Sequence, residues 1–181
     1  EIKPNFVDPI INIGISYKKL RKFNLSKKYF EKSLKIFPNN PIVFNNLGNL
    51  LREDGNISEA INCYDRAINI NKNYIEAINN KAEIFLLQRK FDEAIVEFNK
   101  VLELNPKFLY SFGKLIHCKM NICDWTNFNQ NIKVIEESII NNENIIEPFP
   151  LLSINDNPKL QKINAGLYNN YKFQNNLVKK T

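Results

Sequence analysis

The sequence predicts an all-α fold, a solenoid of stacked helical hairpins followed by an extended linker and a final helix. Two observations carry this prediction. Only five of the 181 residues are Gly, too few for an all-β fold with many tight turns. The chain also repeats itself with a period of 34 residues, and periods of this length are typical of stacked supersecondary units.

Three aligned segments carry the repeat, and they begin at residues 10, 44 and 78. Small residues allow two antiparallel helices to approach closely, and aromatic side chains opposite them fill the remaining space. The small columns are Gly14, Gly48 and Ala82, then Ser26, Ala60 and Ala94, and the aromatic column is Phe30, Tyr64 and Phe98. Each segment is therefore predicted to fold as a pair of packed helices.

The ends of these helices are also marked. Asp8 and Asn40 each precede a Pro, which is typical of a helix start because Pro fits the first helical turn. Asp-Gly-Asn at residues 54–56 predicts a turn between two helices. Apolar residues three and four positions apart, as at Leu47, Leu50 and Leu51, give each helix one apolar stripe.

These columns resemble the tetratricopeptide repeat over about residues 7–108. The resemblance implies a right-handed superhelix that binds a protein or peptide in an extended conformation. It divides the chain into repeats at residues 7–40, 41–74 and 75–108. Residues 1–6, whose Pro4 falls in the column of Pro38, are expected to be the tail of a truncated upstream repeat.

Residues 109–142 form a degenerate fourth repeat, in which Ile116 occupies the small column and Lys119 a large apolar column. A helix is predicted over residues 125–142. Residues 143–181 are predicted to be a linker rich in Pro and apolar residues, followed by a helix over residues 158–173 that leads toward an absent catalytic domain.

The fourth repeat contains the only His and Trp of the chain and two of its three Cys. We predict no metal site here, because His117 and Cys118 are adjacent and point to different sides of a helix, and no second ligand pair is near Cys123. A catalytic thiol would lack a well-placed base. Cys118 and Cys123 are instead predicted to be small buried residues, and Trp125 is predicted to pack at a corner of the fold.

The pattern His117-Cys118, then Cys123-Asp124-Trp125-Thr and Phe128, resembles the junction between repeats and catalytic domain in bacterial-type protein O-GlcNAc transferases. The resemblance implies a structural junction in an enzyme that transfers a sugar from a UDP-sugar to Ser or Thr of proteins. The chain itself has no Gly-rich phosphate loop and no carboxylate pair for acid–base work, so we expect it to be non-catalytic and without a cofactor.

In that family, Asn residues of successive repeats hold the backbone of the substrate on the concave face. The matching positions here are Asn12, Asn46 and Asn80, with Lys114 at the fourth position. An Asn side chain offers a donor and an acceptor, so it can bind a peptide group without reading the neighbouring side chain. The alternative interpretation is that this column is solvated polar surface.

A second candidate function is a free-standing repeat adaptor that mediates protein–protein interaction. A clamp for a terminal carboxylate would need Lys or Arg at inner positions, whereas Asn45, Asn49, Asn79 and Glu83 stand there. The net charge of +6 is scattered among acids, which disfavours nucleic acid as the partner. No apolar run could span a membrane, and the odd number of Cys suits the cytoplasm. Cut ends of the array leave self-association as a further alternative.

Overall fold

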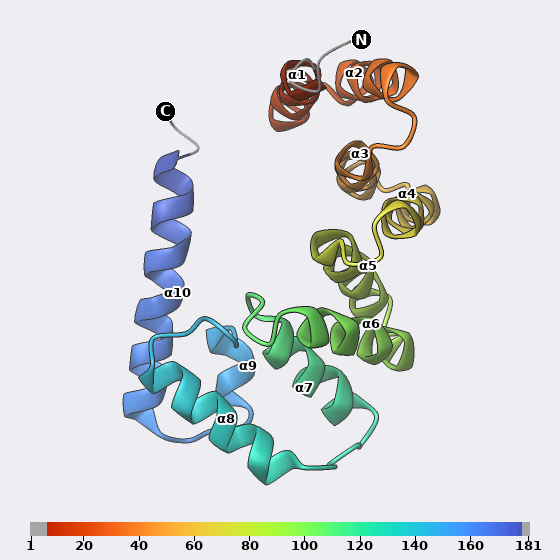
Figure 1. Cartoon of the computed structure of the whole chain (residues 1–181). Coiled ribbons are helices and arrows are strands. Elements are labelled where there is room, and N and C mark those ends of the chain that lie inside the picture. The colour runs from red at the N-terminus through yellow and green to blue at the C-terminus, as the bar shows by residue number, and fades with distance from the viewer. Residues whose placement is uncertain (1–6, 179–181) are drawn as a thin grey trace. The chain divides into compact units, whose positions relative to one another are not determined.

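The computed structural model describes the backbone of residues 7–178 and the side chains of residues 9–173. Ten helices and no strand occur in this part of the chain (Figure 1). The helices form two compact units, one up to Ile84 and the other from Phe85 onward, and the division falls inside α5 (Ile75–Leu87). The predicted tail at residues 1–6 lies outside the described residues.

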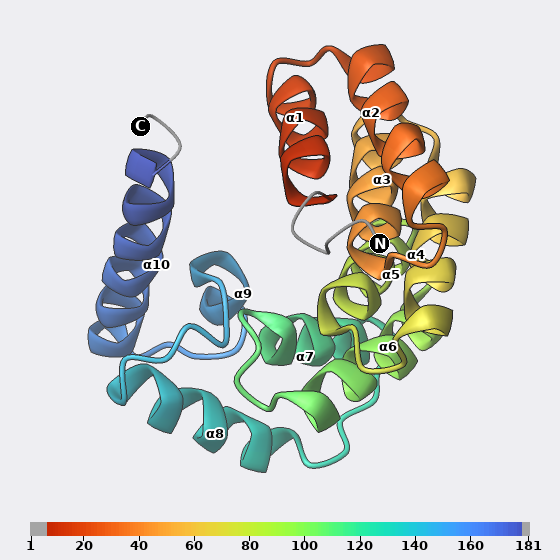
Figure 2. The same cartoon turned by 45° about the horizontal axis from the view of Figure 1, so that its top comes forward.

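The first unit contains two helical hairpins, which Figure 2 shows from a second direction. The helices are α1 (Val7–Lys19), α2 (Phe23–Ile36), α3 (Pro41–Glu53) and α4 (Ile57–Ile70), followed by most of α5.

The small and aromatic columns meet within each of these hairpins, as the sequence predicts. A Cβ atom added to Gly14 would lie 2.7 Å from the Phe30 ring, and one added to Gly48 would lie 2.6 Å from the Tyr64 ring. Both rings are fully buried. The Ser26 hydroxyl donates a 2.8 Å hydrogen bond to the Gly14 carbonyl, which joins the two helices of the first hairpin. A larger residue in either Gly position would therefore push the paired helices apart.

The predicted helix ends can be followed in the same unit. The Asn40 side chain accepts hydrogen bonds from the amides of Ile42 and Val43 and so caps α3, as expected. Asp8 lies within the first turn of α1, and its side chain is outside the described residues. Gly55 has a φ of +86° in the predicted turn, a conformation that Gly adopts without strain.

The second unit contains α6 (Phe91–Leu104), α7 (Ser111–Asn121), α8 (Phe128–Ile140), α9 (Pro148–Leu152) and α10 (Pro158–Val178). The helix predicted over residues 125–142 is thus shorter than expected, and the last helix is longer than the predicted 158–173.

A non-helical segment lies against α7 in this unit. The Tyr110 amide donates to the Asn144 carbonyl and the Gly113 amide to the Ile145 carbonyl, both at 2.9 Å. A Cβ atom on Gly113 would come within 2.9 Å of the Cα atom of Ile146, so only Gly allows this approach. The Tyr110 ring also contacts Tyr168 and Tyr171, with centroids 5.8 and 5.9 Å apart, and these contacts hold α10 beside the start of α7.

The linker between α8 and α10 contains one helical turn, α9, that the sequence analysis did not predict. Its Pro148 and Pro150 both stand in the first turn, where a backbone N–H has no partner within the helix. Leu151 points into a core formed by α7, α8 and α10, together with Ile135, Ile139, Ile146 and Leu160. The linker is therefore packed onto the helices of the second unit.

Candidate functional site

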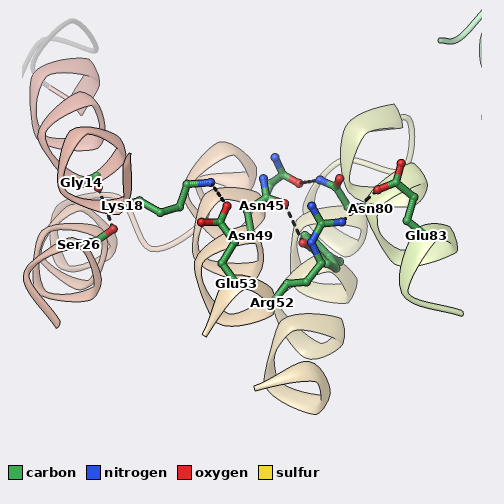
Figure 3. Close-up of polar contacts among 10 residues, drawn as sticks. Gly14, Lys18, Ser26, Asn45, Asn49, Arg52, Glu53, Asn80 and Glu83 are labelled. Carbon is green, nitrogen blue, oxygen red and sulfur yellow. Dashed lines mark hydrogen bonds and ion pairs between the residues drawn. The ribbon is translucent and has the colours of Figure 1, made fainter. Parts of the chain in front are cut away.

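The predicted Asn column lies on the first helices of the repeats in the first unit. Asn12 is exposed on α1, and Asn46 on α3 and Asn80 on α5 are half-buried. The Asn46 side-chain amide donates to the Ile42 carbonyl at 2.9 Å. The Asn80 side-chain amide donates to the Asn45 Oδ1 atom at 2.9 Å, a contact drawn in Figure 3. Among the described residues, no hydrogen bond reaches the Oδ1 atom of Asn46 or Asn80.

These contacts orient the two amides. Each side chain uses one N–H to fix its position and keeps its carbonyl oxygen as an acceptor. We call the surface that carries Asn12, Asn46 and Asn80 the first-helix face. This face offers hydrogen-bond acceptors one repeat apart. The arrangement suits a bound polypeptide in an extended conformation, whose backbone N–H groups recur along its length.

The polar residues beside this column join the helices of the first unit, a role that the sequence analysis missed. The Tyr64 hydroxyl donates to Asn49 Oδ1 at 2.8 Å, and Asn45 and Asn79 are only 7% and 8% exposed. Burial raises the pKa of Tyr74, and the side chains of Tyr74 and Asn45 are joined by a hydrogen bond. The burial of Asn45 and Asn79 could not be read from composition, because Asn also abounds on the exposed surface.

Three of the basic groups on these helices are paired with acids. Lys18 Nζ lies 2.9 Å from Glu53 Oε1, and an Arg52 nitrogen lies 3.1 Å from Glu83 Oε2, as Figure 3 shows. Lys81 forms a 2.7 Å pair with Asp65 on α4. Because each of these cations already has a carboxylate partner, none is held ready for the terminal carboxylate of a peptide.

The predicted fourth position, Lys114, is half-buried on α7 and belongs to the second unit. The set that one unit holds together therefore consists of Asn12, Asn46 and Asn80.

The residues of the predicted junction do not share one environment. Cys118 is fully buried in α7, and this burial raises the pKa of its thiol to about 12 because the thiolate would lose its hydration. His117 is exposed, and its Nε2 atom lies 3.3 Å from the side-chain amide nitrogen of Asn121. The two neighbours thus point to different sides of the helix, as predicted.

Two expectations at the junction are wrong. Trp125 is 54% exposed, and its ring meets the Phe128 ring edge-on with centroids 5.1 Å apart. Cys123 is exposed as well. Both residues lie in the connection between α7 and α8. Cys123 has the positive φ of its repeat equivalents Arg21, Gly55 and Arg89, and Asn127 adds a second positive φ of 57°.

The remaining junction residues stabilise this connection. Asp124 accepts a 2.9 Å hydrogen bond from the Thr126 amide and pairs with Lys119 at 3.3 Å. Hydrogen bonds from Thr126, and then the contact with Lys119, hold the pKa of Asp124 below its ordinary value. Phe128 is half-buried and packs against the core of the second unit. The junction residues therefore shape a loop.

Two other kinds of site are absent from the part of the chain that the structure describes. No group of three or more His, Cys, Asp or Glu side chains converges there in an arrangement that could hold a metal ion. No helix among the same residues has the length and apolar character needed to cross a membrane.

Models of the tetratricopeptide repeat match four overlapping stretches of the chain, at residues 8–40, 29–62, 48–88 and 75–108. Together they cover residues 8–108. Among solved structures, the first TPR of Spaghetti (RPAP3) bound to an HSP90 peptide is similar with a TM-score of 0.62 at 19% identity. The match covers 67% of this chain and 97% of that one. The predicted all-helical repeat fold is confirmed.

Two relatives show what kinds of protein carry similar repeats. A UDP-N-acetylglucosamine–peptide N-acetylglucosaminyltransferase of Giardia intestinalis is 28% identical over 108 residues, which is 60% of this chain and 7% of the relative. The anaphase-promoting complex subunit 6 of Dictyostelium discoideum is 41% identical over 61 residues, 34% of this chain and 7% of the relative. The chain thus corresponds to a small part of either protein.

Proposed function

Residues 8–108 are an array of tetratricopeptide repeats, and from this premise we propose that the first-helix face binds an extended polypeptide. The repeats make the chain a protein-binding module. A structure of the same fold, the Spaghetti (RPAP3) repeat domain, is bound to a peptide. The observation that carries our proposal is the pair of oriented amides at Asn46 and Asn80, whose Oδ1 atoms accept no hydrogen bond from the described residues.

The chemistry of this face favours recognition of backbone over recognition of side chains. Asn12, Asn46 and Asn80 are neutral, and each can accept from a peptide N–H. The nearby cations Lys18, Arg52 and Lys81 are already paired with acids, so a charged ligand gains little from them. A face of this kind would bind polypeptides of many sequences with moderate affinity.

Broad recognition of polypeptide suits an enzyme that modifies many proteins. We propose that the chain is the substrate-recognition arm of a protein O-GlcNAc transferase-like glycosyltransferase, which uses a UDP-sugar donor. Similarity to the Giardia intestinalis transferase over 108 residues supports this proposal, as does the Cys-Asp-Trp-Thr sequence at residues 123–126. The chain would supply binding, and a catalytic domain beyond residue 181 would supply the transfer.

A transfer assay on the protein encoded by the complete gene tests the enzymatic part. Incubation with UDP-N-acetylglucosamine and an unfolded acceptor protein should place N-acetylglucosamine on Ser or Thr residues, as detected by mass spectrometry. Substituting Asn12, Asn46 and Asn80 by Ala should slow transfer to the protein acceptor more than transfer to a short peptide. A gene with no glycosyltransferase domain after Thr181 would contradict the proposal.

A free-standing or scaffolding adaptor is the second candidate, because the anaphase-promoting complex subunit is 41% identical over its matched stretch. An adaptor of this kind would bind one partner at a fixed position, so its affinity would depend strongly on the partner's side chains. The two functions can be separated by two affinities. One is measured for an extended peptide, and the other for a peptide with the same residues in scrambled order. Comparable affinities favour backbone recognition, and loss of binding after scrambling favours the adaptor.

A further inference from the structure

A second concave site lies in the other unit, between α6, α7 and α8. It is a cleft of about 540 Å³, within the range of about 300–1,000 Å³ that is usual for ligand pockets. It is lined by Phe112 and Leu115 of α7, Leu102 of α6 and Val134 of α8. We call it the α6–α8 cleft. It is separate from the first-helix face in position and in chemistry.

The sequence period explains why this cleft is open. Moving back by two repeats places Leu102 on Leu34, Phe112 on Phe44 and Val134 on Arg66. At that equivalent place the first unit has two smaller cavities of about 270 and 250 Å³, and both are lined by Phe44 and Arg66. The same groove thus exists twice, divided in the first unit and continuous in the second.

Arg66 is the residue that divides the groove in the first unit. Its guanidinium carbon lies 5.6 Å from the centre of the Phe44 ring, a cation–π contact that covers the ring and leaves Phe44 only 7% exposed. Val134 is too short to cover Phe112, which stays half-buried. Replacement of Arg by Val at this repeat position therefore turns two small cavities into one larger apolar cleft.

The lining of the α6–α8 cleft contains two carboxylates, Glu103 and Glu143, and one ammonium group, Lys107. Lys107 pairs with Glu143, which also has a hydrogen bond with the Ser138 side chain. Glu103, which also lines the cleft, has no ion-pair partner among the described residues. Asn99 stands one turn before Glu103 on α6, so an amide and a carboxylate without an ion-pair partner follow each other along the lining of the cleft.

We propose that the α6–α8 cleft is a second peptide-binding site, which takes a large apolar side chain with a basic residue beside it. The apolar side chain packs on Phe112 and Leu115. The basic residue pairs with the Glu103 carboxylate, and the Asn99 amide binds the peptide backbone. This site reads side chains, unlike the first-helix face, and so adds sequence preference to a module that otherwise recognises backbone.

The test uses three capped tetrapeptides, Ala-Phe-Arg-Ala, Ala-Phe-Glu-Ala and Ala-Ala-Arg-Ala, titrated into protein with labelled methyl groups. The Phe-Arg peptide should shift the signals of Leu102, Leu115 and Val134 saturably. The Phe-Glu peptide should bind about threefold more weakly, as expected for one exposed ion pair, and the peptide without Phe should not bind. Glu103→Gln should abolish the preference for Arg over Glu.

Exchanging the repeat-equivalent residues provides matched controls. Val134→Arg should cover Phe112 and weaken binding at least tenfold, whereas Arg66→Val should create a second site with shifts at Leu34 and Leu47. Val134 is 39% exposed, so a longer side chain can be placed there, and Val134→Lys serves if the Arg variant does not fold. The Asn12, Asn46 and Asn80 triple Ala variant should bind the tetrapeptide normally, which separates this site from the first-helix face. Unchanged binding in folded Val134→Arg, or saturable binding of toluene with none of the peptide, would overturn the proposal.

Discussion

The two units use glycine for the same purpose against different partners. In the first unit, Gly14 and Gly48 each face an aromatic ring of the partner helix, at distances that leave no room for a methyl group. In the second unit the small column holds Ile116, which is 2% exposed, and Gly113 faces the backbone of Ile146. Close approach is preserved, but it has moved by about one helical turn, and its partner is now a non-helical segment. Loss of the repeat pattern therefore marks a change of packing partner and not a loss of packing.

The largest effect on the free energy of unfolding should come from removing a buried aromatic ring of a regular repeat. Phe30→Ala should lower the free energy of unfolding by roughly 3–5 kcal/mol, because the ring is fully buried against Gly14 and leaves a cavity. Urea denaturation measures this loss. Phe149→Ala is the matched control, since Phe149 is 84% exposed and its removal should cost about 0.5 kcal/mol or less. Similar losses in the two variants would contradict the assigned core.

Substituting the second-unit glycine tests the other half of the comparison. Gly113→Ala should destabilise the protein by about 1–3 kcal/mol, because the added methyl group meets the Ile146 backbone and strains the hydrogen bond from Gly113 to Ile145. Gly166→Ala on α10 is the control. Nothing lies within 4 Å of a Cβ atom there, so Ala should stabilise the helix by about 0.5–1 kcal/mol. If Gly113→Ala stabilised the protein as well, the close packing of residues 144–146 on α7 would be disproved.

The contact between Asn45 and Asn80 joins α3 to α5 and should have a measurable coupling energy. A double-mutant cycle with Ala at each position should give a coupling of about 0.5–1.5 kcal/mol, as for a neutral, partly buried hydrogen bond. Thermal or urea unfolding of the four proteins provides the values. Strict additivity of the two substitutions would show that the hydrogen bond does not contribute.

A similarly small effect is expected at the junction. Trp125→Ala should cost only about 0.5–1.5 kcal/mol, because the half-exposed ring has an edge-on contact with Phe128 and no place in the core. Trp125 is the only Trp of the chain, so its fluorescence reports on this site alone. Acrylamide should quench the emission of the folded protein efficiently. Emission protected from acrylamide, together with a loss of more than about 3 kcal/mol in the free energy of unfolding of Trp125→Ala, would show that Trp125 is buried, as expected from the sequence.

The regular repeats could be predicted well, because each small residue and its aromatic partner recur at a constant spacing. The same reasoning correctly found the Asn40 cap and the turn at Gly55. Reasoning from the sequence failed where the backbone conformation of a loop decides which side chains are buried. Nothing in the sequence around Trp125 shows that Asn127 adds a second positive φ to the loop before α8.

The candidate site was predicted only in outline. The positions of Asn12, Asn46 and Asn80 on first helices followed from the period, but the bond from Asn80 to Asn45 depends on the distance between two helices. The α6–α8 cleft had a signal in the sequence, because Val134 follows Arg66 and Lys100 in one column of the repeat. The effect of this change from a basic residue to Val follows only from the structure, in which the Arg66 guanidinium lies over the Phe44 ring.

Peptide binding by the first-helix face is tested most directly by one titration. A labelled, unstructured peptide long enough to reach α1, α3 and α5 is added to the protein, and its affinity is compared with that of a variant with Ala at Asn12, Asn46 and Asn80. Loss of three neutral hydrogen bonds of about 1 kcal/mol each should weaken binding roughly a hundredfold. Ala at Asn24 and Asn62, which are exposed on second helices, should leave the affinity unchanged. Equal affinities for the protein and the folded triple variant would show that the column is ordinary solvated surface and would contradict the account.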